Sequence, residues 1–249
     1  MGVDSGLPDF RGHEGFWNAY PGLRQANINF QDIASPDTFR NDPRLAWGFY
    51  GHRLKLYRDT EPHQGFAILR EIAQEMQHGA YVYTSNVDGQ FQKAGFSPFK
   101  VVECHGSIHQ LQCVNACTKD IWPSIDFFPE VDIAHCRLLN NLPHCPGCGG
   151  VSRPNLLMFG DCDWMDARSR EQQANLDAWL LKVKRLVIIE LGAGTALPWV
   201  RHFGEFQDGF MIRINPKESQ LPAKRRGIGL TMTALDALKQ IREAWWELG

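Results

Sequence analysis

Four short apolar runs, each followed by small or polar residues, constrain the fold of this chain more than any other feature. They are AYVYTSN at 80–86, FKVVECHG at 99–106, RLVIIELGAG at 185–194 and GFMIRIN at 209–215. Continuous apolar runs of this kind are typical of strands buried on both faces of a parallel sheet. Helical patterns at 166–182 and 232–248 complete an alternation of strands and helices. The sequence therefore predicts an α/β fold with a doubly wound, Rossmann-like parallel sheet.

Two amphipathic stretches precede the first apolar run. Apolar side chains recur at helical spacing in 42–59 and again in 63–79, where Gly79 is placed to end the helix. The segment between the second and third runs lacks long periodicity and carries most of the cysteines. The predicted organisation is a Rossmann-like domain (1–12, 61–106 and 153–249), a helical insertion (13–60) and a small metal-binding module (107–152).

Two close cysteine pairs lie in the small module. Three residues separate Cys113 from Cys117, and two separate Cys145 from Cys148 within CPGCGG. Pairs at this spacing are typical of a tetrahedral four-thiolate zinc site, which is structural because no coordination position stays open. The alternative is a set of thiols that hold no metal.

The remaining cysteines fit no better ligand set. Cys136, and also His144, could replace one zinc ligand, but neither has better spacing, and we expect Cys104 and Cys162 to be ordinary core or loop residues. Seven cysteines in a chain without a recognisable N-terminal export signal favour reduced thiols over disulfides. The predicted location is cytoplasmic.

Net charge and hydropathy argue against two classes of partner. The formal net charge is −2, and the module 107–152 carries only Lys119 and Arg137 as permanent cations against four carboxylates. Nucleic-acid binding needs a basic surface, which this pattern does not provide. No run of 18 apolar residues occurs, so no membrane-spanning helix is expected.

Polar side chains follow the apolar runs at the edge of the sheet where ligands bind in doubly wound folds. Asn86 and Asp88 follow the first run, and either could instead cap the next helix through an Asx turn. His105 ends the second run, where it is either a packed core residue or a general base that titrates near neutral pH. The GAGTAL loop and Asn215 follow the third and fourth runs, and the loop's glycines would let a nucleotide approach the backbone.

Taken together and in order, these motifs resemble those of the sirtuin family of NAD-dependent protein deacylases. SGLPDFRG (5–12) resembles the family's G-I-P-D-F-R cofactor loop, SNVDGQFQKAG (85–95) its Q-N-x-D stretch and VVECHGSI (101–108) its E-x-H-G signature. RPNLLMFGD (153–161) is similar to R-P-x-V-V-x-F-G-E, and GAGTAL with Asn215 to the nucleotide contacts G-T-S and N. The cysteine pairs stand where the family carries its zinc module.

This resemblance implies a reaction and a role for each motif. NAD would be consumed as a co-substrate, with an acyl-lysine protein or peptide as partner, giving nicotinamide and O-acyl-ADP-ribose. His105 would act as general base, and Leu157 and Phe159 would line the acyl-lysine channel, with 156–160 pairing to the substrate backbone. The implied cofactor contacts are Asp9, Phe10, Arg11, Ser85, Asn86, Asp88, Gly194, Thr195 and Asn215, of which Asn86 and Asp88 would also serve catalysis. Zinc would bind Cys113, Cys117, Cys145 and Cys148.

Several positions depart from the family pattern. Ser85 replaces Gln, Ala196 replaces the Ser of G-T-S, and Asp161 replaces Glu. Sirtuins that prefer acidic acyl groups carry a Tyr-x-x-Arg pair near the helical insertion. Tyr20 and Arg24 are one residue further apart than that spacing, so we expect them to be structural.

The start of the chain also departs from the family. Sirtuins carry an apolar strand and a G-A-G-x-S turn before the cofactor loop, and Met1 stands where that turn would end. The resemblance therefore leads us to expect roughly 15–30 further residues upstream, enough for a strand and a phosphate-binding turn. Without them, a central strand and the pyrophosphate cradle would be missing.

Other functions remain open from the sequence. The same scaffold could serve an NAD-consuming hydrolase or an ADP-ribosyltransferase, or a catalytically impaired form that lacks the first strand. A zinc-module protein without catalytic activity, which binds a partner, is the reading from a different functional class.

Overall fold

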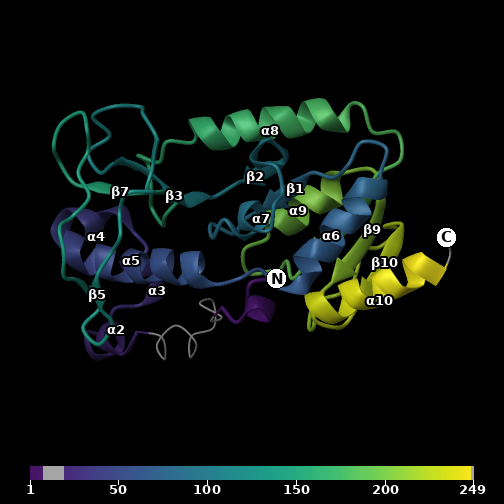
Figure 1. The fold of residues 1–249 in the computed structure, drawn as a ribbon, viewed down its shortest axis with the longest axis horizontal. Coiled ribbons are helices and arrows are strands. Elements are labelled where there is room, and N and C mark those ends of the chain that lie inside the picture. The colour runs from purple at the N-terminus through teal and green to yellow at the C-terminus, as the bar shows by residue number, and fades with distance from the viewer. Residues whose placement is uncertain (8–19, 248–249) are drawn as a thin grey trace.

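The computed structural model describes residues 1–7 and 20–247 (Figure 1). Its parallel sheet has two parts. Strand β1 (Val82–Thr84) pairs with β2 (Val101–Glu103), and β9 (Phe210–Ile214) lies between β8 (Val187–Leu191) and β10 (Gly227–Leu230). All of these pairings are parallel. The four predicted apolar runs thus contain β1, β2, β8 and β9, while β10 was not predicted.

Four helices pack around this sheet. They are α6 (Gln64–Glu75), α8 (Ala167–Leu180), α9 (Trp199–Phe206) and α10 (Ala234–Glu247). Helix α8 packs against β2, α9 against β8, and α10 against α6 (Figure 1). The predicted helices at 63–79, 166–182 and 232–248 correspond to α6, α8 and α10, and the fold is the expected Rossmann-like α/β architecture.

The described part of 13–60 is helical. It contains α2 (Pro21–Gln25), α3 (Phe30–Ile33), α4 (Pro36–Asn41) and α5 (Pro43–Asp59). Asp42 starts α5 by accepting a hydrogen bond from the Leu45 amide at 3.1 Å, and Pro43 takes the first helical position, where no donor is needed. Three short helical turns lie elsewhere: η1 (Val3–Ser5), α7 (Gln90–Lys93) and η2 (Pro98–Lys100).

The cysteine-bearing segment is framed by two antiparallel strands. β3 (Gly106–Cys113) pairs with β7 (Ser152–Leu156) on one side and with β4 (Trp122–Pro123) on the other. Between them β5 (Val131–Asp132) and β6 (Arg137–Leu138) form a small antiparallel pair that packs on α5. The domain boundaries given above stay a prediction.

The largest core surrounds α5. Trp47, Phe49 and Leu54 are fully buried in it, and the Trp47 indole donates a hydrogen bond to the Ser152 carbonyl in β7 at 2.8 Å. Gly48 lets α5 approach the loop at Cys136, because a Cβ at this glycine would lie 2.0 Å from the Cys136 carbonyl oxygen. This core therefore ties the helical segment to the cysteine-bearing segment.

One sequence expectation about the sheet is wrong. The apolar runs were expected to form strands buried on both faces, which holds for β2 but not for β1 or β8. All three residues of β1 are half-buried, and the Val187 side chain in β8 is 54% exposed. Within the described residues, β1 pairs only with β2 and β8 only with β9, so each has an edge without a neighbouring strand.

None of the helices in the described ranges is long and apolar enough to cross a membrane.

Candidate functional site

Asn86 and Asp88 follow β1 at the edge of the sheet where the strand ends. The Asn86 amide donates to the Thr84 hydroxyl at 3.0 Å, and the Asp88 carboxylate accepts from the Gln90 amide at 3.0 Å. Asp88 is 8% exposed, and its bond to the Gln90 amide forms an Asx turn just before α7, whose N-cap is Gly89. This role does not exclude a ligand contact by the second carboxylate oxygen.

Burial raises the pKa of Asp88 above its ordinary value. The hydrogen bond from the Gln90 amide works in the opposite direction, since it favours the ionised form. The ring nitrogen Nε2 of His109 in β3 lies 2.9 Å from the Asp88 carbonyl oxygen, and burial lowers the pKa of His109. The turn after β1 is thus fixed by both backbone and side-chain contacts.

His105 lies in the turn between β2 and β3 and is half-buried. Its carbonyl oxygen accepts a hydrogen bond from the Leu157 amide at 3.0 Å. The next residue, Gly106, has φ +79°, and a Cβ there would lie 2.1 Å from the Asn155 carbonyl oxygen, so only glycine allows β7 to come this close. The histidine and the start of the 156–160 segment are therefore held side by side.

The segment after β7 alternates between outward and inward side chains. Leu157 and Phe159 are 39% and 38% exposed, while Met158 between them is buried in the core around α5. The Phe159 amide donates to the Ala34 carbonyl at 3.0 Å, and its ring lies edge-on to Phe30 at 5.9 Å. Two apolar side chains are thus exposed on the segment whose backbone is hydrogen-bonded to His105.

A buried ion pair anchors this segment. Two guanidinium nitrogens of Arg153 in β7 donate to the two carboxylate oxygens of Asp161 at 2.8 Å each, and both side chains are fully buried. Asp161 also accepts from the Met158 amide at 3.3 Å. The shorter carboxylate found here in place of Glu therefore closes the loop onto the strand before it.

The loop after β8 is held by Asn215, which follows β9. The Asn215 side-chain amide donates to the Ala193 carbonyl at 3.1 Å, and its oxygen accepts from the backbone amides of Lys217 and Glu218 at 2.9 Å. Asn215 is buried, so in this structure it orders the two loops of the predicted nucleotide site.

Glu218 is a site residue that sequence reasoning missed. Its carboxylate accepts from the Thr195 backbone amide at 2.9 Å and from the Thr195 hydroxyl at 2.6 Å. These hydrogen bonds lower the pKa of Glu218. The amide and the hydroxyl of Thr195 thus already donate to the Glu218 carboxylate. A phosphate bound at Thr195 would have to displace that carboxylate.

The residues that follow β1 and β2 meet those that follow β8 at one cavity and one ring contact. Ser85 and Asn86 line the same cavity of about 710 Å³ as Gly194. The His105 ring lies 6.4 Å from the ring of Trp199, which starts α9 just after the glycine loop. The structure thus brings residues after β1, β2 and β8 together, whereas Asp9, Phe10 and Arg11 lie outside the described residues.

Four sulfur atoms form the candidate metal centre. The Sγ atoms of Cys113, Cys117, Cys145 and Cys148 all lie within 4.8 Å of one another. Cys113 and Cys148 are 3.7 Å apart, and Cys117 and Cys145 are 3.6 Å apart. Ligands about 2.3 Å from a tetrahedral Zn²⁺ would be separated by about 3.8 Å, so the donor set and its geometry fit a structural zinc ion.

Backbone groups around the metal centre favour thiolates. Burial raises the pKa of Cys113, but hydrogen bonds from the backbone amides of Cys117 and Asn115 outweigh it and lower that pKa to about 7. The neighbouring sulfurs raise the pKa of Cys117 instead, as expected when thiols share one site without a cation. The alternative ligand Cys136 lies in the core around α5, outside the four-sulfur cluster.

Tyr20 is part of the core, as expected. It is 1% exposed, and its hydroxyl lies 3.0 Å from the ring nitrogen Nδ1 of His52. A second pair, Tyr50 and Arg53, has the Tyr-x-x-Arg spacing within α5 and was not predicted from the sequence. Tyr50 is buried, and the Arg53 guanidinium donates to the Tyr57 hydroxyl. The spacing itself was the signal that could have identified this pair.

Comparisons with known proteins agree with this arrangement. Residues 1–180 match the model of the Sir2 family. The chain is 30% identical over 221 residues to an NAD-dependent protein deacylase of Aquifex aeolicus, an alignment that covers 89% of this chain and 82% of the relative. An NAD-dependent protein deacylase of Pyrococcus furiosus is 27% identical over 224 residues, covering 89% and 80%.

Solved structures show the same fold. A Sir2 homolog in complex with NAD superposes with a TM-score of 0.70 at 21% identity, covering 99% of this chain and 86% of that one. A structure described as the structural basis of sirtuin substrate affinity gives 0.68 at 19% identity, covering 97% and 89%. With a family match over most of its length and a matching fold, the chain belongs to the Sir2 family, the sirtuins.

Proposed function

We propose that this protein is an NAD-dependent protein-lysine deacylase. The observation that carries the proposal is the backbone hydrogen bond from Leu157 to His105, which joins the turn that carries His105 to a segment with two exposed apolar side chains. A neutral acyl-lysine can enter an apolar channel, whereas a charged ammonium would lose its hydration there. The relatives from Aquifex and Pyrococcus are named for the same activity.

The donors around the sheet edge suit a dinucleotide. Thr195 holds the carboxylate of Glu218 through an amide and a hydroxyl, the types of donor that a phosphate or ribose oxygen also accepts. Asn215 orders the loop beneath them, and Ser85 and Asn86 line the cavity next to the loop's glycines. We propose that Gly194, Thr195 and Asn215 bind the adenosine and phosphate end of NAD.

In this reaction NAD supplies an activated bond between ribose and nicotinamide, whose cleavage lets the ribose accept the acyl oxygen. Asn86 and Asp88 orient the ribose and the nicotinamide at the end of β1. His105 takes a proton from a ribose hydroxyl as general base. Leu157 and Phe159 position the acyl-lysine while the bond between ribose and nicotinamide breaks. One water molecule then replaces the lysine nitrogen on the acyl carbon, and the products are nicotinamide, a free lysine side chain and O-acyl-ADP-ribose.

Replacement of His105 tests this proposal. We expect His105→Ala to lower deacylation by about 10²–10⁴-fold, the usual contribution of a general base, without a change in thermal stability. The assay follows an acyl-lysine peptide and NAD by mass spectrometry. Cys162→Ala, at an exposed cysteine outside the metal cluster, is the matched control. Near-normal turnover in His105→Ala would contradict the assignment of the base.

The same assay separates the other enzymatic functions. A deacylase releases O-acyl-ADP-ribose, whereas a hydrolase releases free ADP-ribose and a transferase leaves ADP-ribose on the protein substrate. The peptide panel should include acetyl-lysine and succinyl-lysine, because Tyr50 and Arg53 have the spacing found in sirtuins that prefer acidic acyl groups. The protein substrate in the cell and the cytoplasmic location stay predictions.

A further inference from the structure

The amino ends of strands β8, β9 and β10 form an edge of the sheet that lies opposite the candidate site. Because these strands are parallel, the residues that precede them gather at one edge, while the candidate nucleotide loops lie at the other. The Phe210 amide at the start of β9 donates to the Leu186 carbonyl at 2.9 Å. The Met211 amide donates to the Arg226 carbonyl at 3.0 Å. The segments before the three strands are therefore neighbours in space.

These segments concentrate positive charge. They comprise residues 181–186, 207–209 and 222–226, and they contain six Lys and Arg side chains against one carboxylate, Asp208. Five of the cations are exposed, and we call this set the basic edge: Lys182, Lys184, Arg185, Lys224 and Arg226. The formal net charge of the whole chain is −2, so the overall charge conceals a strong local separation of charge.

The cations of the basic edge do not neutralise carboxylates of the fold. In the same part of the sheet, Arg213 forms a buried ion pair with Glu190. Arg225 is half-buried and donates to the Gly204 and Glu205 carbonyls at the end of α9, at 3.4 Å each. By contrast, no carboxylate among the described residues forms an ion pair with a side chain of the basic edge. The charge of this edge is therefore available to a partner.

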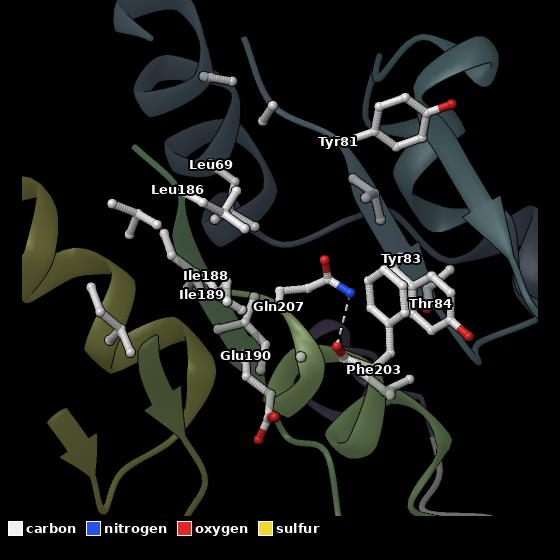
Figure 2. Close-up of a pocket in the computed structure, with 18 of the residues that line it drawn as sticks. Leu69, Tyr81, Tyr83, Thr84, Leu186, Ile188, Ile189, Glu190, Phe203 and Gln207 are labelled. Carbon is white, nitrogen blue, oxygen red and sulfur yellow. Dashed lines mark hydrogen bonds between the residues drawn. The ribbon is translucent and has the colours of Figure 1, made fainter. Parts of the chain in front are cut away.

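Two apolar side chains protrude beside the basic edge. Leu181 follows α8 and is 90% exposed, and Phe206 ends α9 and is 87% exposed, the two highest values among the large apolar side chains that the structure describes. The Leu181 amide donates to the Asp177 carbonyl at 3.2 Å. The Gln207 side chain donates to the Phe203 carbonyl at 3.3 Å, as Figure 2 shows in its view of the cavity between β1 and β8. The exposure of both side chains is thus built into hydrogen-bonded turns.

Cations beside protruding apolar side chains match the surface of an anionic phospholipid membrane. The acidic headgroups attract Lys and Arg, and a Leu or Phe among the cations enters the boundary between headgroups and acyl chains. A nucleic acid would also attract the cations, but its bases stack on aromatic rings and gain nothing from an exposed leucine. The position of Leu181 next to Lys182 therefore favours a lipid surface over a nucleic acid.

We propose that the basic edge, together with Leu181 and Phe206, is a docking surface for an anionic phospholipid membrane. The two apolar side chains enter the headgroup boundary, and the cations contact the lipid phosphates. Binding of this kind takes place at the membrane surface and needs no membrane-spanning helix. The opposite edge of the sheet, with Thr195 and Asn215, then faces away from the lipid and stays open to substrate. This inference goes beyond the proposed function and does not depend on it.

The test is co-sedimentation of the protein with lipid vesicles. We expect at least about tenfold tighter binding to phosphatidylcholine vesicles that contain about 30% phosphatidylserine than to phosphatidylcholine alone. Binding should weaken about tenfold when the salt concentration rises from about 0.1 M to about 0.5 M, because exposed charges are screened. The triple variant Lys184→Ser, Arg185→Ser, Arg226→Ser should lose about 10²-fold in affinity, which is about fivefold per cation.

Two control variants separate the basic edge from charge in general. A second triple variant, Lys55→Ser, Lys119→Ser, Lys239→Ser, removes the same charge at exposed positions outside the basic edge. We expect it to bind the anionic vesicles nearly as tightly as the unmodified protein. The exchange Lys184→Arg with Arg185→Lys conserves the charge and should also retain binding. Thermal unfolding of each variant shows that the fold is unchanged.

The apolar part of the surface is tested separately. Leu181→Ser combined with Phe206→Ser should weaken binding to the anionic vesicles by about tenfold or more, because two apolar side chains no longer leave water. The salt dependence should stay that of the unmodified protein, since no charge is removed. The melting temperature should also stay unchanged, because both side chains are exposed in the free protein.

Several results would overturn the proposal. Equal binding to the two kinds of vesicle would contradict it, and so would equal losses of affinity in the two triple variants. Tighter binding of a polyglutamate peptide or of polyuridylate RNA than of the vesicles, lost in the basic-edge triple variant, would assign this surface to an acidic protein or to RNA instead. Deacylation measured without vesicles reports on the proposed function separately.

Discussion

The core around α5 and the cavity between β1 and β8 are built from the same residue types but differ in how well those residues are packed. Leu54 in α5 is fully buried among aromatic rings and the strands of the cysteine-bearing segment. Leu69 in α6 has the same side chain on a similar helix, yet it lines an open cavity. An amphipathic helix is therefore not enough to bury its apolar side chains, because another surface must also pack against them.

The polar contacts do not differ in this way. The core region contains the buried pair Arg153–Asp161, and the sheet region contains the buried pair Arg213–Glu190, whose members are 1% and 2% exposed. Burial raises the pKa of Glu190, and its bonds to Arg213 work in the opposite direction. Both regions thus pair a buried arginine with a buried carboxylate, and the two regions differ in their apolar packing.

The largest change in stability should come from loss of the metal at the four-cysteine cluster. We expect about one zinc ion per chain, and its removal by a chelator should unfold the cysteine-bearing segment, costing several kcal/mol of stability. Cys145→Ser should have a similar effect, while Cys104→Ser should not change the metal content. Zinc content is measured by mass spectrometry and stability by thermal unfolding. A metal-free chain with unchanged stability would contradict the zinc assignment.

Leucine truncation on each side tests the packing difference directly. Leu54→Ala should lower the free energy of unfolding by about 2–5 kcal/mol, because it opens a void in a closed core. Leu69→Ala should cost about 1 kcal/mol or less, since it only enlarges an existing cavity. Both values come from denaturant unfolding. A similar loss of unfolding free energy in Leu54→Ala and Leu69→Ala would show that the cavity between β1 and β8 is closed in solution.

A smaller change in stability is expected from replacement of Asp88, which lies in the turn after β1. Burial raises the pKa of this carboxyl group in the folded state, so folding favours its protonated form. Its stability contribution is therefore present below the unfolded pKa and is lost as pH rises through the folded pKa. Asp88→Asn should remove this dependence and stabilise the protein at neutral pH by on the order of 1 kcal/mol or less, with reduced deacylation. Unfolding curves between pH 3 and 8 measure it, and an unchanged pH dependence in the variant would contradict this assignment.

Local patterns predicted the secondary structure well where the period was long or the run was apolar. Helices α5, α6, α8 and α10 and strands β1, β2, β8 and β9 lie within predicted segments. Two of the missed elements, β10 and α9, are a glycine-containing strand and a short helix directly after the glycine loop. Neither carries a pattern that is long enough to stand out from the neighbouring loops.

The candidate site followed from the sequence only in part. The four zinc ligands were identified by spacing, because close pairs of thiols have few other uses in a chain without disulfides. The contact between Glu218 and Thr195 was not predictable, since it joins residues 23 positions apart through the pairing of β8 with β9. The Arg153–Asp161 clamp likewise depends on how the segment after β7 folds back.

The sequence by itself determined the family, the parallel strands, the helices and the thiolate cluster, because these depend on residue type and local spacing. Only the tertiary structure decided which apolar faces are covered. In the sequence, β1 and β8 have the pattern of strands from the middle of a sheet. In the fold, both strands line the same open cavity. Burial is a property of two surfaces in contact, and a one-dimensional pattern describes only one of them.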